Sequence, residues 1–315
     1  MIPTKKSIEA AHERIKPYIH QTPVSSSESL NEMFGVEIYF KCENFQKIGA
    51  FKMRGAANAA LKLSSADLQK GLATHSSGNH AQAVALAAKK LNTKAFIVMP
   101  SNSPKVKVNA VLGYGAEVIF CEPNQKAREK ALQEVVEKTG AFFIHPYDNY
   151  DVIEGQATSA KELIEEISFL DKIFCPVGGG GLLSGTLLSA AYFGNNIPVI
   201  AGEPEGANDA FLSLQKGEKV VLPSVNTIAD GLLTSLGDKN FEIILPRIQA
   251  IITVTDEEIK QALRLIWERM KIIVEPSCAV PLAALIKERD KFQGQKIGII
   301  LSGGNVDLAK VAEWF

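Results

Sequence analysis

Short runs of β-branched and aromatic residues alternate along the chain with longer segments whose apolar residues recur every three or four positions. The short runs contain few polar positions, a pattern typical of parallel strands that are buried on both faces. We expect strands at residues 38–41, 71–77, 95–100, 116–121, 141–145, 172–177, 198–203, 250–254 and 296–302. We expect helices between them at residues 80–91, 103–115, 126–140, 155–167 and 256–271.

Such alternation of strands and helices predicts an α/β fold with right-handed crossover connections. The length of 315 residues is enough for about two domains, each with a core of its own. Residues 71–147 contain a complete βαβαβ unit, which we expect to form a small, mobile α/β domain. Residues 1–70 and 148–315 would then form the larger domain into which it is inserted.

The composition excludes several classes of protein. A net charge of −1 argues against a nucleic-acid partner or an anionic membrane. We find no apolar run of the roughly 20 residues that a membrane span needs, and no signal-peptide core at the start. The cysteines, at positions 42, 121, 175 and 278, are far apart and form no CxxC pair, so we expect neither a zinc site nor a disulfide framework. A cytoplasmic location is the simplest interpretation.

One lysine lies in unusual surroundings, in the stretch GAFKMRGA (49–56). Lys52 stands between Phe51 and Met53, with Gly49 and Gly55 on either side. Lysine side chains usually remain in water. Lys52 therefore either only caps this turn, or its amine is held in a pocket for chemistry.

Ligands of open α/β sheets bind at the carboxyl ends of strands. One predicted strand end reads THSSGNHAQ (74–82), where Ser76, Ser77 and Asn79 begin an alanine-rich helix. Backbone N–H groups at a helix start, together with hydroxyl and amide groups, suit a carboxylate. A plain Ser/Asn helix cap fits the same residues equally well. For His80, packing or hydrogen bonding in the first helical turn fits better than a role as a base.

A second strand end carries four consecutive glycines, in PVGGGGLLSG (176–185). Glycines let the backbone turn its N–H groups inward, and a helix start follows, which favours a phosphate cradle over a flexible turn. The run from Gly179 also reads G-x-G-x-x-S, close to a dinucleotide fingerprint, with Ser184 where Gly or Ala is usual and Glu203 as the ribose-binding acid. A nicotinamide-dependent dehydrogenase is therefore an alternative.

Two further strand ends carry polar residues. LSGGN (301–305) places Ser302 where it could bind a ligand or simply form a turn. In GEPEGAND (202–209), Glu203, Asp209 and the carbonyl group of Ala207 could share a hard cation such as magnesium or calcium. From the residues alone, a turn with a helix cap is the stronger interpretation of this stretch.

Together, a shielded lysine, a phosphate cradle and a carboxylate site meet the needs of pyridoxal 5′-phosphate. This cofactor requires a lysine for its Schiff base, an anion site for its phosphate and a partner for its ring nitrogen. Shielding from water lowers the pKa of a lysine, and the neutral amine is nucleophilic. We therefore expect Lys52 to carry the cofactor.

The motifs FKMRGA, SSGNHAQ, GGGGLLSG, ADG (229–231) and LSGGN follow one another in the order found in fold type II pyridoxal-phosphate enzymes. Within that group, the chain resembles the serine/threonine dehydratases and serine racemases, from about residue 19 to residue 308. The resemblance implies two open, twisted, mostly parallel sheets flanked by helices, as in the β subunit of tryptophan synthase. It also implies a homodimer that acts on serine, threonine or 3-hydroxyaspartate.

The resemblance also assigns roles to residues. Lys52 would hold the cofactor and act as the base on one face of the substrate. The other cofactor-binding residues would be Phe51 beside the ring, Asn79 at the ring 3-oxygen, Gly178, Gly179, Gly180, Gly181 and Leu182 at the phosphate, Gly231, and Ser302 at the ring nitrogen. The substrate carboxylate would be surrounded by Ser76, Ser77, Asn79 and His80, with Arg128 nearby. Glu203, Ala207 and Asp209 match a divalent-cation site for Mg²⁺, Ca²⁺ or Mn²⁺, which reverses the interpretation from the residues alone.

Ser77 bears on the reaction. In relatives that resemble serine racemases, a serine here is the proton donor on the second face, whereas many similar threonine dehydratases read SAGNH. This chain reads SSGNH. We therefore expect serine racemisation together with β-elimination of water. The alternative is an ammonia-lyase that acts on threo-3-hydroxyaspartate, threonine or serine with little racemase activity, and a catalytically silent amino-acid-binding relative is a further possibility.

Two departures from the family limit what carries over. Glu28 and Ile48 replace small polar residues near the nucleotide site of animal serine racemases. An acid close to a triphosphate is unfavourable, so we expect no activation by ATP. The chain also ends soon after the last motif, and we expect no regulatory domain and no feedback control by isoleucine.

Overall fold

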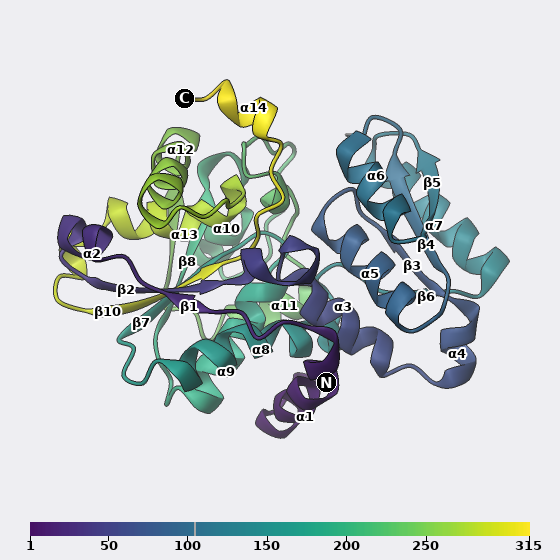
Figure 1. The fold of residues 1–315 in the computed structure, drawn as a ribbon, viewed down its shortest axis with the longest axis horizontal. Coiled ribbons are helices and arrows are strands. Elements are labelled where there is room, and N and C mark those ends of the chain that lie inside the picture. Colours follow the sequence, from purple (N-terminus) through teal and green to yellow (C-terminus); the bar gives the residue numbers. More distant parts are fainter. Residues whose placement is uncertain (104) are drawn as a thin grey trace.

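The computed structural model describes residues 1–103 and 105–315 and contains two separate sheets (Figure 1). The larger sheet has six strands in the order β1-β2-β10-β7-β8-β9, and the smaller has four in the order β5-β4-β3-β6. All pairings are parallel except that of β1 with β2. The strands are β1 (Val24–Ser25), β2 (Glu37–Cys42), β3 (Leu72–His75), β4 (Ala95–Pro100), β5 (Glu117–Cys121), β6 (Phe142–Phe143), β7 (Lys172–Pro176), β8 (Val199–Pro204), β9 (Ala250–Val254) and β10 (Lys296–Leu301).

Helices flank both sheets (Figure 1). They are α1 (Lys5–Ile15), α2 (Glu28–Phe34), α3 (Lys52–Leu61), α4 (Ser65–Lys70), α5 (Asn79–Lys90), α6 (Lys105–Gly113), α7 (Gln125–Thr139), α8 (Tyr150–Glu166), α9 (Gly181–Phe193), α10 (Asp209–Lys216), α11 (Asp238–Ile244), α12 (Asp256–Leu265), α13 (Pro276–Lys287) and α14 (Leu308–Ala312). Within the described residues, no helix is both long and apolar enough to span a bilayer.

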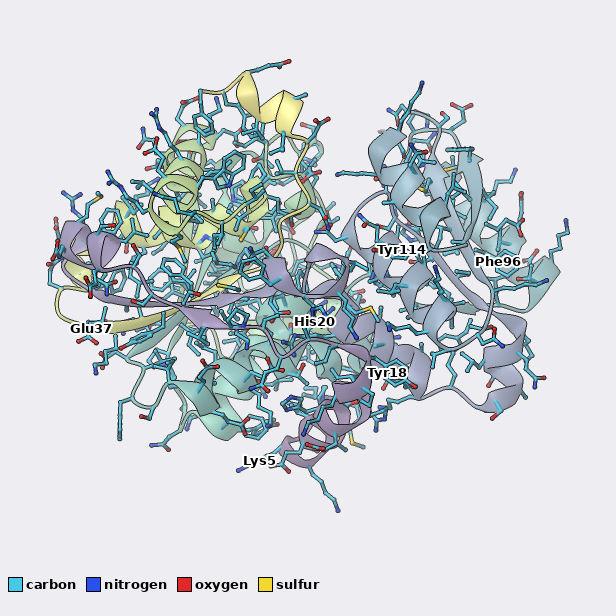
Figure 2. The ribbon with its side chains drawn as sticks, in the orientation of Figure 1. Lys5, Tyr18, His20, Glu37, Phe96 and Tyr114 are labelled. Atoms are coloured by element: carbon cyan, nitrogen blue, oxygen red, sulfur yellow. The ribbon has the colours of Figure 1, made fainter. Side chains whose placement is uncertain are left out.

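The predicted α/β class with two mostly parallel sheets is confirmed. All strands of the smaller sheet lie between residues 72 and 143, inside the range expected for the small domain. In Figure 2, Phe96 of β4 and Tyr114 lie in the part that carries this sheet, whereas Glu37 of β2 lies at the far end of the larger sheet. The exact division into domains and the mobility of the smaller one stay predictions.

The observed elements differ from the expected ones mainly at their ends. Strand 71–77 ends at His75, because the serines after it form a turn, and strand 141–145 is reduced to β6. Helix 103–115 is observed as α6, and residue 104 lies outside the described residues. Helix 256–271 changes into a π-helix at Ile266–Met270 and ends at Lys271, whose φ of 61° cannot continue a right-handed helix.

Candidate active site

Lys52 is the first residue of α3, and the turn before it is joined to the end of β10. The N–H group of Phe51 donates to the carbonyl oxygen of Ser302 at 3.0 Å. A bridge between Ala50 and Gly303 extends this pairing. The start of α3 is therefore anchored on the carboxyl edge of the larger sheet, next to the predicted ring-nitrogen partner Ser302.

A buried ion-pair network holds α3 in place. Arg54, two residues after Lys52, is completely buried. It binds both oxygens of Glu43 at 2.7 and 2.8 Å and both oxygens of Glu162 at 2.7 Å. Lys41, also buried, binds Glu162 at 2.7 Å. Charges removed from water need such partners, so Arg54 has few alternative positions.

The amine of Lys52 is partly buried and points at one acceptor. Its Nζ donates to the carbonyl oxygen of Pro146 at 2.7 Å and lies 5.1 Å from the centre of the Phe51 ring. Burial lowers the pKa of Lys52 to about 8, against the opposing effect of the negative charge on Glu275. About a tenth of the amine is therefore neutral at pH 7, as a nucleophile or base requires, against less than about a thousandth at the ordinary lysine pKa.

Tyr147, next to Pro146, connects Lys52 to the glycine turn. A Cβ atom on Gly179 would lie 2.4 Å from the Tyr147 ring, and one on Gly181 would lie 3.1 Å from the same side chain. Gly180 has a φ of 93°, and α9 begins at Gly181. Only glycines fit this turn, which leaves the first N–H groups of a long helix available to an anion.

The segment after Ala229 closes the site beside the glycine turn. A Cβ atom on Gly178 would lie 3.0 Å from the Cα atom of Leu232. The N–H group of Gly231 donates to Oγ of Ser277 at 2.9 Å. Ser302 is 3% exposed at the end of β10. The structure thus brings Lys52, the glycine turn, Gly231 and Ser302 together from distant parts of the sequence.

The serine turn lies where β3 ends and α5 begins. Oγ of Ser76 accepts from the N–H group of Gly78 at 3.3 Å, and Ser76, Ser77 and Asn79 are all half-buried. The His80 ring is buried, with Nε2 3.0 Å from the carbonyl oxygen of Ile144, and burial holds its pKa well below the usual value. His80 is therefore neutral, and its role at a substrate carboxylate stays a prediction.

Arg128 comes from α7, in the smaller sheet's half of the structure. Its Nε is buried without a hydrogen-bond partner among the described residues. The pKa of His75 is lowered, first by burial and then by the positive charge of Arg128. His75 directly precedes Ser76, so Arg128 lies in the neighbourhood of the serine turn, although it makes no described hydrogen bond to that turn. Its role at the substrate stays a prediction.

Sequence reasoning missed Glu275 and Asn305, which both contact Asn79. Nδ2 of Asn79 donates to the two carboxylate oxygens of Glu275 at 2.9 and 3.1 Å, and Nδ2 of Asn305 donates to Oδ1 of Asn79 at 2.9 Å. Burial and the nearby charge of Asp230 raise the pKa of Glu275 to about 7. The signal for Glu275 was an acid directly before Pro276, at a helix start, and the signal for Asn305 was its place at the end of the LSGGN motif.

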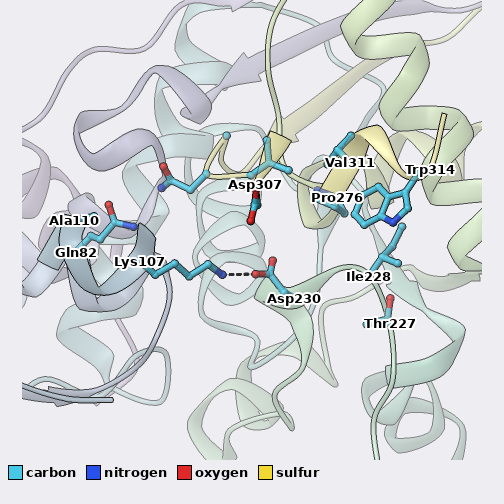
Figure 3. A pocket seen from close by; sticks show the side chains of 13 residues that line it. Gln82, Lys107, Ala110, Thr227, Ile228, Asp230, Pro276, Asp307, Val311 and Trp314 are labelled. Atoms are coloured by element: carbon cyan, nitrogen blue, oxygen red, sulfur yellow. Dashed lines mark hydrogen bonds and ion pairs between the residues drawn. The ribbon is translucent and has the colours of Figure 1, made fainter. Parts of the chain in front are cut away.

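A cavity of about 410 Å³ adjoins these residues (Figure 3). Gln82 of α5 and Lys107 of α6 line it from the helices beside the smaller sheet, and Asp230, Asn305 and Trp314 line it from later segments of the chain. Lys107 forms an ion pair with Asp230 across it. Because Asp230 directly precedes Gly231, this ion pair connects α6 to the segment that borders the glycine turn.

The two predicted metal-binding acids lie at the end of β8 and at the start of α10. Glu203 accepts from the N–H groups of Ala210 and Phe211 at 2.9 and 2.8 Å, and Asp209 accepts from that of Leu236 at 2.8 Å. Burial raises the pKa of both acids, that of Glu203 to about 8. Neither forms an ion pair within the described residues, which also contain no cluster of three metal-binding side chains. Two buried carboxyl groups whose hydrogen bonds among the described residues come from backbone N–H groups suit a hard cation.

Comparison with known proteins agrees with this geometry. The family model described as pyridoxal-phosphate dependent enzyme matches residues 15–303. The chain is 50% identical to a serine racemase of Dictyostelium discoideum over 98% of this chain and 97% of that protein, and 45% identical to a β-hydroxyaspartate dehydratase of Paracoccus denitrificans over 98% of each. The structure of maize serine racemase superposes with a TM-score of 0.97 at 44% identity, covering 100% of this chain and 97% of that one.

The family match spans Lys52, the serine turn and the glycine turn together. The dehydrogenase alternative is wrong, because the family that matches residues 15–303 is that of pyridoxal-phosphate dependent enzymes. The buried amine and the anion-binding helix start fit the aldehyde and the phosphate that pyridoxal phosphate would present. The chain belongs to the family of pyridoxal-phosphate dependent enzymes.

Proposed function

We propose that this enzyme is a serine racemase that also removes water from serine and threonine by β-elimination. The observation that carries the proposal is the position of Lys52. Its partly buried amine donates to the carbonyl oxygen of Pro146, and the next residue, Tyr147, packs against the glycine turn. The serine in SSGNH and the similarity to serine racemases support the racemase assignment.

Pyridoxal phosphate, when bound, withdraws electrons from the substrate and acidifies its Cα–H bond. Lys52 would hold the cofactor covalently and then accept the α-proton on one face, since its lowered pKa leaves the amine partly neutral. Gly178 to Gly181 and Leu182 would bind the phosphate through N–H groups at the start of α9. Phe51 and Gly231 would border the ring.

The two faces of the substrate would meet different groups. Ser77, in the turn after β3, would return a proton on the face opposite Lys52, and this inverts the configuration. Backbone N–H groups of the turn, with Ser76, Asn79 and Arg128, would bind the carboxylate, and His80 would border it. At the ring nitrogen, the neutral hydroxyl of Ser302 would not stabilise a positive charge as a carboxylate does, which favours loss of a β-hydroxyl group.

We further propose that Glu203, Asp209 and the carbonyl group of Ala207 hold a divalent cation, Mg²⁺, Ca²⁺ or Mn²⁺. The burial of both acids without an ion pair among the described residues supports this site. A homodimer in the cytoplasm completes the proposal. The family resemblance supports the homodimer. The four described cysteines, all of which are free, support the cytoplasmic location.

A second candidate is a 3-hydroxyaspartate ammonia-lyase with little racemase activity. The relative from Paracoccus denitrificans favours it, because it is nearly as similar to this chain as the serine racemases are. A substrate of this class carries a second carboxylate. Nε of Arg128 could donate to it, since this atom is buried without a hydrogen-bond partner in the described structure.

A panel of substrates separates the two candidates. The purified enzyme with pyridoxal phosphate is incubated with L-serine, D-serine, L-threonine and the threo and erythro forms of 3-hydroxyaspartate. Chiral chromatography follows inversion, and keto-acid release follows elimination. The proposal predicts D-serine from L-serine together with pyruvate. Keto acid from 3-hydroxyaspartate without any inversion of serine would favour the second candidate instead.

A further inference from the structure

The side-chain amide of Asn79 is held at both ends. Its Nδ2 donates to both carboxylate oxygens of Glu275, and its Oδ1 accepts from Nδ2 of Asn305. The terminal torsion of an asparagine is otherwise broad, so an untethered amide would sample several orientations. With these partners, the nitrogen end faces Glu275 and the oxygen end faces Asn305.

Glu275 is built into the fold for this contact. It is 4% exposed and forms no ion pair within the described residues. Its N–H group donates to the carbonyl oxygen of Gly303 at 3.0 Å. A Cβ atom on Gly303 would lie 2.8 Å from a carboxylate oxygen of Glu275, and one on Gly231 would lie 3.8 Å from it. The missing side chain of Gly303 therefore leaves space that the carboxylate occupies, whereas Gly231 only borders it.

Asn305 connects Asn79 to the turn before Lys52. Its Nδ2 also donates to the carbonyl oxygen of Ile48 at 2.6 Å, and the N–H group of Gly304 donates to the carbonyl oxygen of Gly49 at 2.9 Å. Ile48 has a φ of 63°, a left-handed conformation that is strained for a β-branched residue. The surrounding hydrogen bonds hold this turn in place, so the same asparagine orders both the approach to Lys52 and the Asn79 amide.

We propose that Glu275 and Asn305 are positioning residues that fix the Asn79 amide so that its remaining N–H points at the cofactor. This inference rests on the proposed role of Asn79 at the ring oxygen. An Nδ2 group has two hydrogens; in this scheme the two carboxylate oxygens of Glu275 share one of them and polarise the amide, and the second remains for the ring oxygen. Neither residue touches the substrate in this scheme, and both act through Asn79.

Several charges face Glu275 from the elements around it. Asp230 raises the pKa of its carboxyl group, and Lys107 of α6 lowers it. Lys52 of α3 is close enough for the negative charge of Glu275 to raise the pKa of the Lys52 amine. Removing this charge while keeping the shape should therefore change the pH dependence of the bound cofactor, independently of any loss of orientation.

A double-mutant cycle tests the inference with cofactor binding as the readout. Apoenzyme is titrated with pyridoxal phosphate for Glu275→Ala, Asn79→Ala and the double variant. We expect Glu275→Ala to raise the cofactor Kd about tenfold when Asn79 is present and less than about twofold when it is replaced. Equal losses in both backgrounds, or no loss, would show that Glu275 does not act through Asn79.

Two further variants make the result specific. Glu275→Gln keeps an acceptor for Nδ2, so it should restore most of the affinity while shifting the pH midpoint of the visible absorbance. Asn305→Ala removes the hydrogen bond to Oδ1 of Asn79 and is tested in the same cycle. It replaces Glu275→Ala if that variant does not fold. An unchanged midpoint in Glu275→Gln would overturn the charge effect. None of these measurements uses a substrate, so failure to racemise serine would refute the proposed function and leave this inference standing.

Discussion

Arg54 forms a two-pronged ion pair with Glu162, in which Nη1 and Nη2 each lie 2.7 Å from a different carboxylate oxygen. The pair joins α3 to α8, and both side chains are buried. Because Arg54 is two residues beyond Lys52, the ion pair helps to hold the first turn of the helix that carries the amine. Stability and cofactor chemistry therefore depend on the same short helix.

Replacing Arg54 with methionine should lower the free energy of unfolding by about 3–5 kcal/mol, because Glu43 and Glu162 would remain buried without their main partner. Urea denaturation measures this change. Arg289→Met is the matched control, since Arg289 pairs with Asp290 at an exposed site and should contribute less than about 1 kcal/mol. A comparable, small effect of both substitutions would contradict the role of the buried network.

The rate at which apoenzyme recombines with pyridoxal phosphate should depend on the protonation of Lys52. As the pH increases toward about 8, the rate should rise because more of the amine becomes neutral. At higher pH the rate should level off. Stopped-flow absorbance across this range gives the midpoint. Glu275→Gln should lower the midpoint, because the negative charge that favours the ammonium form is removed. A midpoint near the ordinary lysine value of 10.5 would show that the amine is not shielded.

Ser77→Ala should reduce racemisation of serine by at least about a hundredfold, the usual contribution of a general acid or base, while β-elimination persists. Proton removal by Lys52 serves both reactions, whereas proton return on the second face serves only racemisation. The two products are measured in one reaction mixture. Ser76→Ala is the neighbouring control and should not separate the two activities. Parallel loss of both activities in Ser77→Ala would refute the two-base assignment.

Stability without a divalent cation should fall as the pH rises from about 4.5 to about 8. The folded-state pKa of Glu203 is raised, so the folded protein retains a proton that the unfolded chain releases over this range. A divalent cation should remove this loss, since it binds the deprotonated acids. Thermal unfolding with Mg²⁺ or with a chelator measures both effects.

The control for the cation site is the neighbouring Glu205, which is partly exposed and pairs with Lys287. Glu203→Gln should abolish the stabilisation by Mg²⁺, and Glu205→Gln should retain it. Equal stabilisation of both variants would place the cation elsewhere.

Gly180→Ala should weaken cofactor binding, because its φ of 93° is unfavourable for alanine and its Cβ atom would lie 2.7 Å from Asn240 and Leu236. Gly217→Ala separates strain from crowding, since Gly217 has a φ of 71° with nothing within 4 Å. The control should cost about 1–2 kcal/mol of stability and leave the cofactor Kd unchanged. Titration with pyridoxal phosphate measures the cofactor Kd of both variants. Equal affinities would argue against a phosphate at this turn.

Local patterns in the amino-acid sequence were enough to predict the α/β class, the parallel strands and the segments that carry chemistry. Buried parallel strands need continuous apolar runs, and a glycine turn before a helix has few other uses, so both leave a local signature. Lys52 and the four glycines therefore stood out as candidates from their sequence neighbours, whereas the role expected for Ser77 came from the family resemblance.

How these segments meet depends on the tertiary fold. Glu275 and Asn305 hold Asn79 across about 200 residues of sequence, and Tyr147 packs on the glycine turn. Asn305 ends the LSGGN motif, but no local pattern shows that any of these three residues makes its contact. The pKa values of Lys52, Glu203 and Glu275 likewise depend on burial by distant segments. Desolvation and hydrogen-bond partnership are properties of the folded packing, whereas periodicity and turn chemistry are local, and this difference separates what could be predicted from what could not.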